Sequence, residues 1–367
     1  MRIRVIDPAS YTRPYDHALC AALAHRGNDV ELVASRFRHG EVPQPDGYRL
    51  SEDFYRLPGP LPVRVAQHPL DMLRLRFGTQ PDVTHFQWLP IQRVDRHLLP
   101  PGPVVLTAHD VIPREPRPGQ LGALRATYSS VDAVVVHSEH GKGVLVERLD
   151  VDPAKVEVVP HGVFDYLTEV SDAKPLPAEL AEVERPVVLC FGLWRPYKGI
   201  DLIIRAFSEL KADAELWIVG MPRMPVEPLK QLATELGLGE RVKFVPRFVG
   251  DSELGAYFRR ADIVALPYRE IDQSGVLFTA LAFGKPIVAT RVGGFGEIED
   301  RFAAIATVPA EDETALAARL DQLLTSPQAR EDLARAAAAA AVGELSWDRV
   351  ATRTLEVYTR AIDSAVS

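Results

Sequence analysis

The chain has 367 residues, with 42 basic and 50 acidic side chains and a formal net charge of −8. This acidic balance argues against a protein that wraps the phosphate backbone of nucleic acid, so we expect no nucleic acid partner. The length suggests two domains, each with a sizeable core. The only two cysteines are Cys20 and Cys190, which excludes a disulfide framework and favours a reducing compartment.

The N-terminal sequence lacks the pattern of an export signal. Its apolar run is broken by Asp7 and Pro8, so it is too short for the apolar region of a signal peptide. No stretch of about 18 apolar residues occurs anywhere, and the sequence therefore predicts no membrane-spanning helix. From these two features we expect a cytoplasmic protein.

Short apolar runs, rich in β-branched residues, alternate with longer amphipathic segments along the whole chain. Several runs lack polar alternation, as expected of strands buried on both faces of a parallel sheet. We predict strands at residues 3–6, 30–33, 83–86, 104–107, 133–137 and 156–159 in the first half, and at 187–191, 216–219, 242–245, 263–266 and 287–290 in the second.

The segments between these runs have helical spacing. Residues 200–210 carry one apolar stripe, and the alanines at 336–341 favour another helix. Asp251 or Ser252 is placed to cap a further helix. Residues 347–362 form a last amphipathic segment. Such alternation of strand and helix is typical of a doubly wound α/β sheet.

The periodic pattern is lost between Gly162 and Arg185. We therefore predict two Rossmann-like domains, residues 1–165 and 166–346, followed by a separate helical segment, residues 347–367. Ligands of such folds bind beyond the carboxyl ends of the strands. The loops that follow strands are thus where we expect the chemistry.

One such loop runs from Gly192 to Gly199, after the strand at 187–191. Arg195 and Lys198 lie three residues apart in it, directly before a helix. Backbone N–H groups and the helix dipole attract an anion there, and two cations neutralise a diphosphate. A solvated basic turn is the alternative interpretation.

A second loop follows the strand at 263–266. Glu270 and Asp272 are placed to bind sugar hydroxyls, while Ser274 and Gly275 offer N–H groups at the start of the next helix. The alternative is that Asp272 or Ser274 only caps that helix.

Several motifs of the second half occur in a specific order and spacing. They are Arg195-Pro-Tyr-Lys198-Gly199, Val219-Gly220, Tyr257 with Ala261-Asp262, Leu266-Pro267-Tyr268, Ala280-Leu-Ala-Phe-Gly284-Lys285-Pro286, and Val292-Gly293-Gly294 with Glu297. With them, residues 186–360 resemble the nucleotide-sugar half of glycosyltransferase family 4, retaining enzymes of the GT-B fold. Looser matches at Thr107-Ala-His109-Asp110 and Val159-Pro160-His161-Gly162-Val163 extend the resemblance to nearly the whole chain.

The resemblance implies two Rossmann-like domains that face a cleft, with the last helix crossing back to the N-terminal domain. It implies retaining transfer of a hexose from a nucleotide diphosphate sugar to a hydroxyl of a saccharide or lipid-linked acceptor. Polysaccharide or glycoconjugate synthesis is the expected role. Neither a metal nor another cofactor is expected, because cations of the protein would stabilise the leaving diphosphate.

The resemblance also suggests roles for individual residues. Catalytic roles fall to Arg195, Lys198 and His109, with a histidine satisfied by loop hydrogen bonds as the alternative for His109. The donor-binding set is Gly192, Glu270, Asp272, Gln273, Ser274, Gly275, Val276 and Thr279. The acceptor-side set is Tyr15, Trp88 and Asp110, although Trp88 can equally be a core residue.

Two departures from the family pattern concern ligand contacts. The family has two glutamates separated by seven residues, and here Ile271 and Thr279 occupy their positions. The second glutamate typically holds the ribose, and a threonine lacks its charge-assisted hydrogen bond. Near the N-terminus, the segment 7–16 replaces a Gly-Gly loop and would meet a ligand with side chains rather than bare backbone.

Residues 63–77 mix arginines with large apolar side chains. Related enzymes dock on membranes through such an element, so a peripheral contact with the inner face of the membrane is one interpretation. A short helix packed on its own sheet, interrupted at Pro69, is the favoured one. His137 and His140 lie three residues apart, but His137 ends a strand, which disfavours a metal site.

Two other functions would use the same scaffold. A nucleotide-sugar epimerase would interconvert donors without an acceptor. A non-catalytic nucleotide-sugar-binding protein would not need Arg195 and Lys198 beside a helix N-terminus.

Overall fold

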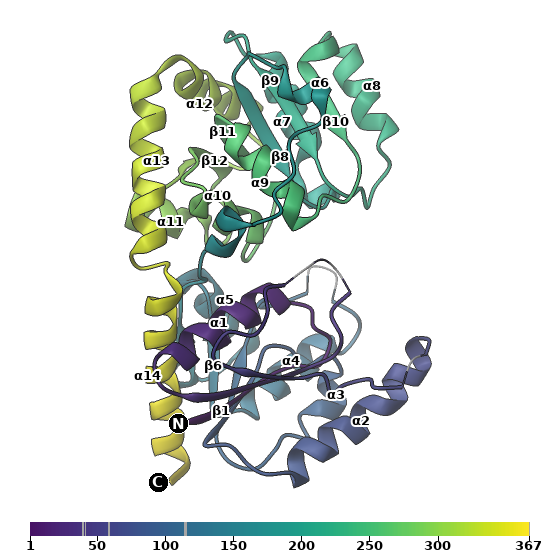
Figure 1. The fold of residues 1–367 in the computed structure, drawn as a ribbon, viewed down its shortest axis with the longest axis vertical. Coiled ribbons are helices and arrows are strands. Elements are labelled where there is room, and N and C mark those ends of the chain that lie inside the picture. Colours follow the sequence, from purple (N-terminus) through teal and green to yellow (C-terminus); the bar gives the residue numbers. More distant parts are fainter. Residues whose placement is uncertain (39, 41, 58, 114–115, 367) are drawn as a thin grey trace. The chain divides into compact units, whose positions relative to one another are not determined.

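The computed structural model of the protein describes residues 1–38, 40, 42–57, 59–113 and 116–366. The chain divides into two compact units: unit 1 combines Met1–Gly162 with Trp347–Ser367, and unit 2 is Val163–Ser346. Each unit is built around one parallel sheet (Figure 1).

Unit 1 contains a seven-stranded sheet with the strand order β3-β2-β1-β4-β5-β6-β7, and every pairing is parallel. The strands are β1 (Arg2–Asp7), β2 (Asp29–Ala34), β3 (Arg49–Ser51), β4 (Val83–Phe86), β5 (Val104–Thr107), β6 (Ala133–Val136) and β7 (Val156–Val158). The helices are α1 (Arg13–His25), α2 (Leu61–Phe77), α3 (Gln92–Asp95), α4 (Gln120–Ser129), α5 (Glu139–Leu149) and α14 (Trp347–Val366).

The C-terminal helix α14 belongs to unit 1 and lies beside α1 (Figure 1). Its apolar side is buried through Val350, Ala351, Val357 and Tyr358, in keeping with the helical spacing of these residues. Arg26, just after α1, donates to the Asp348 carboxylate at 2.8 Å. Helix α14 is thus held by apolar packing and by a surface ion pair.

Unit 2 contains a six-stranded sheet with the order β10-β9-β8-β11-β12-β13, again all parallel. The strands are β8 (Val187–Phe191), β9 (Glu215–Val219), β10 (Val242–Val245), β11 (Ile263–Leu266), β12 (Ile287–Thr290) and β13 (Ala306–Val308). The helices are α6 (Ala178–Ala181), α7 (Ile200–Ser208), α8 (Glu227–Glu235), α9 (Asp251–Arg260), α10 (Gly275–Ala282), α11 (Phe295–Phe302), α12 (Glu313–Thr325) and α13 (Pro327–Val342).

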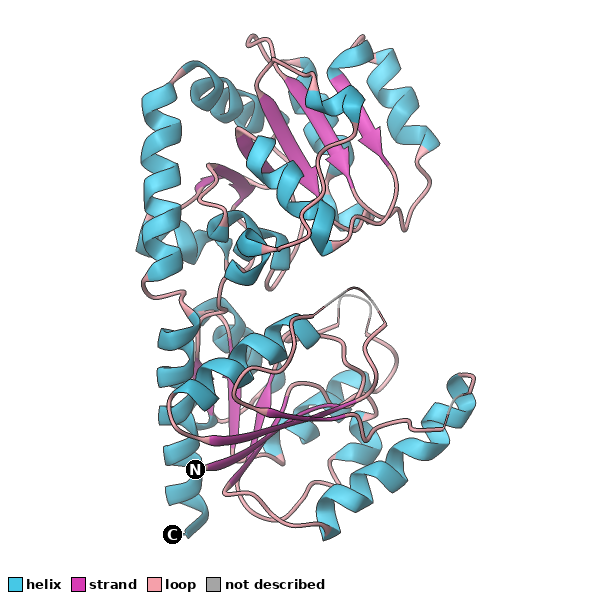
Figure 2. Cartoon of the chain, viewed as in Figure 1, coloured by secondary structure: helices cyan, strands magenta, loops and turns pink. Residues whose placement is uncertain are grey.

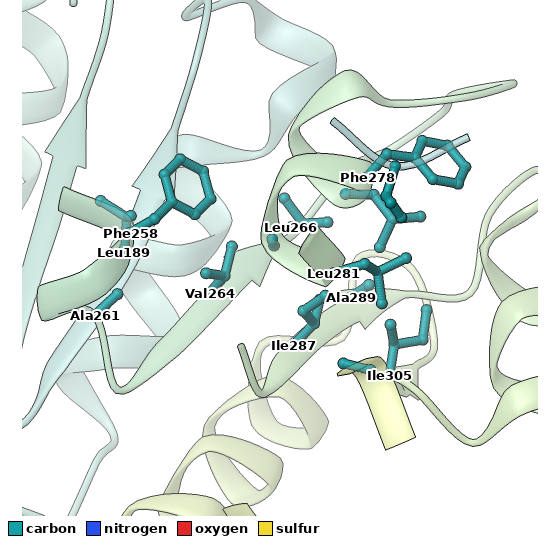
Figure 3. Close-up of a cluster of buried hydrophobic side chains, with 14 of the residues drawn as sticks. Leu189, Phe258, Ala261, Val264, Leu266, Phe278, Leu281, Ile287, Ala289 and Ile305 are labelled. Carbon is teal, nitrogen blue, oxygen red and sulfur yellow. The ribbon is translucent and has the colours of Figure 1, made fainter. Parts of the chain in front are cut away.

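Helices cover both faces of the unit 2 sheet (Figure 2). Along β8, Val187 and Leu189 point into one apolar cluster, while Val188 and Cys190 point into the other. Figure 3 shows part of the first cluster, where β11 and β12 residues meet Phe278 and Leu281 of α10. Strands buried on both faces explain why the sequence shows continuous apolar runs.

All eleven predicted strands form, and the doubly wound fold class is confirmed. Two edge strands were not predicted, β3 and β13. Each has only three residues, and β3 reads Arg-Leu-Ser, so neither gives an apolar run long enough to distinguish it from a loop.

Two local predictions about helices are wrong. Helix α2 continues through Pro69 over 17 residues. Proline removes the bond to the carbonyl four residues earlier, but Val65 is exposed, so water can reach that carbonyl. The N-cap of α9 is Gly250, and Asp251 lies inside the first turn, where its charge still favours the helix dipole.

Both sheets have a point at which the strand order reverses. It lies between β1 and β4 in unit 1, and between β8 and β11 in unit 2. In open parallel sheets, ligands bind outside the carboxyl ends of the strands at this point. The loops after these four strands are therefore the first places to look for a site.

Candidate functional site

The loop after β8 is held against the loop after β9 by backbone contact. Gly192 and Gly220 both have positive φ, and a Cβ on Gly220 would lie 1.9 Å from the Gly192 carbonyl oxygen. The N–H of Trp194 also donates to the Met221 carbonyl at 2.9 Å. Only glycine permits this approach, so the predicted donor-binding residue Gly192 shapes the backbone of the site.

The same loop is also bound to the segment after β11. Gly199 has a φ of 63°, and a Cβ there would lie 1.9 Å from the Pro267 carbonyl oxygen. Arg269 donates its backbone N–H to Tyr197 O at 2.8 Å and its guanidinium to Pro196 O at 2.8 Å. Arg269 therefore joins the two loops that flank the reversal point of the sheet.

Arg269 is itself held by two carboxylates. Its guanidinium donates to both oxygens of Asp201, in the first turn of α7, at 2.9 and 2.8 Å, and to Glu311 at 2.6 Å. The hydrogen bond with Arg269 helps to hold the pKa of Asp201 below its usual value against the effect of burial. Asp201 therefore remains ionised and keeps the guanidinium fixed.

The two predicted catalytic cations have different environments. Arg195 is exposed, whereas Lys198 is only 8% exposed. The Lys198 ammonium lies 3.7 Å from the ring centroid of Tyr268 and 5.4 Å from that of Tyr197. Lys198 is thus the cation held inside the site, and Arg195 lies at its surface.

The loop after β11 presents the predicted donor-binding residues. Glu270 and Gly275 are exposed, Asp272, Gln273 and Val276 are half-buried, and Ser274 is buried. Ser274 is the N-cap residue of α10 but its side chain makes no capping hydrogen bond. Instead, its Oγ lies 3.3 Å from the Tyr268 hydroxyl. The simple capping interpretation of Ser274 is therefore wrong.

The loop after β12 packs against the backbone of the loop after β11. Gly293 has a φ of 51°, and a Cβ there would lie 1.7 Å from the Ile271 carbonyl oxygen. Thr279, inside α10, is buried and donates its hydroxyl to the Gly275 carbonyl at 2.9 Å. Because that proton is used within the helix, a ribose hydroxyl would have to act as the donor to Thr279.

In unit 1, a carboxylate occupies the loop after β1. The side chain of Asp7 accepts the backbone N–H groups of Ala9 at 3.2 Å and Thr12 at 3.1 Å. Burial raises the pKa of Asp7, and raises that of the neighbouring, hydrogen-bonded Asp16 well above its usual value. An anion at the start of α1 would therefore compete with the Asp7 carboxylate for the N–H group of Thr12, the N-cap residue.

Tyr15 and three histidines, of which His137 and His161 are buried and His109 is half-buried, form a cluster at the carboxyl edge of the unit 1 sheet. The Tyr15 ring is 2% exposed, and its centroid lies 4.8 Å from His109, 5.4 Å from His137 and 4.9 Å from His161. The Trp347 ring of α14 lies 5.0 Å away. Tyr15 is thus enclosed by protein rings.

Both ring nitrogens of His109 contact other side chains. Its Nε2 lies 2.9 Å from the Gln87 amide, and its Nδ1 lies 3.2 Å from His137 Nε2. Its ring stacks on Trp88 at 5.3 Å. Burial lowers the pKa of His109 well below its usual value, so the ring is neutral near pH 7. A substrate proton could reach His109 only by displacing one of these contacts.

A cavity of about 250 Å³ lies beside His109 within unit 1. Its lining includes Trp88, Asp110, Gln87, Gln92 and Gln120. An aromatic face with several hydrogen-bonding groups suits a ring that carries hydroxyls. Two of the three predicted acceptor-side residues, Trp88 and Asp110, thus share one cavity, and Tyr15 is not among its lining residues.

The predicted site residues did not include several of these residues. Gln87, His137, Tyr268 and Arg269 all lie at or just beyond the carboxyl end of a predicted strand, which is the signal that could have found them. Across the described ranges, no group of three or more His, Cys, Asp or Glu side chains could hold a metal ion. Nor does that part of the chain contain a helix long and apolar enough to cross a membrane.

Comparisons with known proteins agree with this architecture. A family model described as Glycosyltransferase Family 4 matches residues 15–164, and one described as Glycosyl transferases group 1 matches residues 185–326. Relatives include a D-inositol 3-phosphate glycosyltransferase of Salinispora tropica, 33% identical over 64% of this chain and 52% of that protein. The one of Kineococcus radiotolerans is 28% identical over 94% of this chain and 89% of that protein. With the first two curated relatives, the match spans about half of their length.

Solved structures show the same fold. Sucrose-phosphate synthase from Thermosynechococcus elongatus has a TM-score of 0.77 at 19% identity, over 99% of this chain and 100% of that one. Anabaena Alr3699/HepE in complex with UDP and glucose has a TM-score of 0.76 at 19% identity, over 98% and 99%. These are GT-B structures. With the two family models together covering more than three quarters of its length, the chain belongs to glycosyltransferase family 4.

Proposed function

We propose that this protein transfers a hexose from a nucleoside diphosphate sugar to a hydroxyl of an acceptor, with retention of the anomeric configuration. The observation that carries the proposal is the position of Lys198. Its ammonium lies at the reversal point of the unit 2 sheet, against Tyr268, whose hydroxyl contacts Ser274 at the start of α10. A cation and a helix N-terminus on adjoining loops form a receptor for a diphosphate.

The chemistry follows from this arrangement. Breaking the bond between the anomeric carbon and the phosphate places negative charge on the leaving diphosphate. Lys198, Arg195 and the first N–H groups of α10 would stabilise that charge as it develops. The acceptor would attack from the face the diphosphate leaves, and the diphosphate would take its proton. This step uses no metal and no protein nucleophile.

Contacts to the rest of the donor would come from the loop after β11. Glu270 and Asp272 flank the position of the family's first glutamate, and their carboxylates suit sugar hydroxyls. Gln273 and Val276 lie next to the start of α10. Thr279 would receive a hydrogen bond from the ribose.

The acceptor would bind in the unit 1 cavity. Its volume of about 250 Å³ lies just below the range of about 300–1,000 Å³ typical of drug-sized ligands, so one sugar or cyclitol ring is the fitting size. The curated relatives are named for D-inositol 3-phosphate. We propose a saccharide or lipid-linked acceptor, in polysaccharide or glycoconjugate synthesis, with Trp88 against its ring and Asp110 on a hydroxyl.

A peripheral membrane contact at the inner face is part of the proposal. Helix α2 exposes Leu61, Leu70 and Phe77, and Arg64 and Arg74 lie on the same helix. Exposed apolar groups interspersed with arginines bind anionic lipid surfaces. The rest of the protein would remain in the cytoplasm.

Donor consumption tests the proposal. Hexoses linked to UDP, GDP, ADP and dTDP would be incubated with the protein, a chelator and an acceptor panel. We expect one donor to release its nucleoside diphosphate faster when an acceptor is present. Interconversion of donors without that release would favour an epimerase. Binding without turnover, unchanged in Lys198→Ala, would favour a non-catalytic protein.

A further inference from the structure

Tyr268 occupies a central position between the two arms of the proposed diphosphate receptor. It lies two residues after the end of β11 and is 1% exposed. One face of its ring lies 3.7 Å from the Lys198 ammonium, and its hydroxyl lies 3.3 Å from Ser274 Oγ. One side chain therefore contacts the basic turn after β8 and the start of α10.

The burial of Lys198 requires a compensating interaction. Lys198 is only 8% exposed as a residue, and burying a charged side chain is costly unless other groups replace the water. The face of an aromatic ring carries negative charge density and attracts a cation. The Tyr268 ring therefore offsets part of the lost hydration, and an uncharged ring does not repel an incoming phosphate as a carboxylate would.

Tyr268 is itself fixed in place. Its ring lies 5.6 Å from the Phe295 ring, and the neighbouring Arg269 joins its loop to Pro196 and Tyr197. Burial raises the pKa of Tyr268, so its hydroxyl stays protonated and can donate or accept toward Ser274. Side chain and backbone therefore have little freedom to move when ligand binds.

We infer that Tyr268 is a positioning residue of the donor site, which presents Lys198 to the diphosphate through its ring and aligns Ser274 through its hydroxyl. The inference rests on the proposed function. It separates two contributions: the ring supports the cation, and the hydroxyl orients the start of α10.

Two substitutions separate these contributions. Tyr268→Phe keeps the ring and removes the hydroxyl, whereas Tyr268→Leu removes the ring. The affinity for UDP, or for whichever of UDP, GDP, ADP and dTDP stabilises the wild type most, would be measured by titration calorimetry. We expect Tyr268→Leu to weaken binding about 3- to 30-fold, and Tyr268→Phe to remain within about threefold of the wild type.

Phe258→Leu is the matched control for the loss of a buried ring. Phe258 lies in the same apolar cluster and is fully buried, and its ring centroid lies 5.2 Å from that of Phe191 and 5.4 Å from that of Phe283. Thermal unfolding of all variants would show that they fold. We expect Phe258→Leu to lower the melting temperature as Tyr268→Leu does, with unchanged nucleotide affinity.

A double-mutant cycle decides whether Tyr268 acts through Lys198. In a Lys198→Ala background, Tyr268→Leu should have almost no further effect on nucleotide affinity. An undiminished effect in that background, or no effect in the wild type, would overturn the inference. If Lys198→Ala itself leaves the affinity unchanged, the proposed diphosphate site is wrong instead.

Discussion

The two units share a parallel, doubly wound sheet but differ at the point where the strand order reverses. In unit 2, glycines at positions 192, 199, 220 and 293 bring the loops into backbone contact, and a cation lies among them. In unit 1, the loop after β1 is filled by the carboxylates of Asp7 and Asp16, and its neighbours are buried histidines. The same topology thus yields one proposed receptor for an anion and one edge whose polar groups bind each other.

Because the histidines are unevenly distributed, the stabilities of the two units should depend differently on pH. No histidine occurs between residues 163 and 346, so unit 2 has none. In unit 1, burial lowers the pKa of His85 to about 3 and that of His137 to about 4. In the unfolded chain these histidines have a pKa of about 6.5. Below that pH the unfolded chain binds protons that the folded rings do not bind, so acid destabilises unit 1.

We expect unit 1 to lose stability first between pH 6.5 and pH 4, while unit 2 retains it. Over this window, each of these two histidines lowers the free energy of unfolding by about 1.4 kcal/mol for each unit that the pH falls. The raised pKa values of Asp7 and Asp16 act oppositely, because acid protonates them more readily in the folded state, so they reduce the slope. Hydrogen exchange, read for peptides of each unit at pH 7 and 4.5, measures the effect. Equal loss of protection in both units would contradict it.

Removal of the buried cation tests the anion receptor of unit 2. We expect Lys198→Ala to lower the transfer rate by about 10²–10³, and Arg195→Ala to lower it less, because Arg195 is exposed. Arg205→Ala is the matched control, because it also removes one positive charge, from α7. Arg205 makes only a long ion pair, with its Nε 3.8 Å from a carboxylate oxygen of Glu313. A Lys198→Ala enzyme as active as the Arg205→Ala enzyme would remove the basis of the comparison.

Glycine substitutions test whether backbone contact shapes the unit 2 loops. Gly199 and Gly237 both have positive φ, but a Cβ meets Pro267 O only at Gly199 and meets nothing within 4 Å at Gly237. Gly237→Ala should cost about 1–2 kcal/mol for its φ alone. Gly199→Ala should cost about 1–3 kcal/mol more, as measured by denaturant unfolding. If both substitutions lowered the free energy of unfolding equally, the close approach of Gly199 to Pro267 would not contribute to stability.

A smaller effect is expected where a charged side chain only holds a loop. Arg269→Lys would keep the charge but lose the paired hydrogen bonds to Asp201 and the bond to Pro196 O. Displacement of the turn should lower the transfer rate about tenfold. The thermal stability should change little, because Arg269 is partly exposed. Rates equal to the wild type would show that the Gly199 contact alone sets the turn.

Much of the fold could be predicted because its strands are apolar on both faces. The apolar runs at residues 187–191 and 263–266 predict strands by themselves. Arg49–Ser51, in contrast, forms a strand only because β2 lies next to it. The different environments of Arg195 and Lys198 could not be predicted. They depend on Tyr268, which lies 70 positions further along the chain and is brought near by the pairing of β8 with β11.

The same limit applies to the acceptor side. A histidine after a strand suggests a proton acceptor, but the partners of His109, Gln87 and His137, directly follow two other strands, β4 and β6. Likewise, Asp7 occupies the anion position of its own loop only once that loop has folded back on it. Residue type and strand order locate such a site, and long-range packing decides which groups remain available to a ligand.

A crystal structure of the protein with a bound nucleoside diphosphate tests the central claim most directly. We predict that its phosphate oxygens lie within hydrogen-bond distance of the Lys198 ammonium and of the first N–H groups of α10. Phosphates bound elsewhere, with Lys198 still resting on Tyr268 and contacting no ligand, would contradict the account.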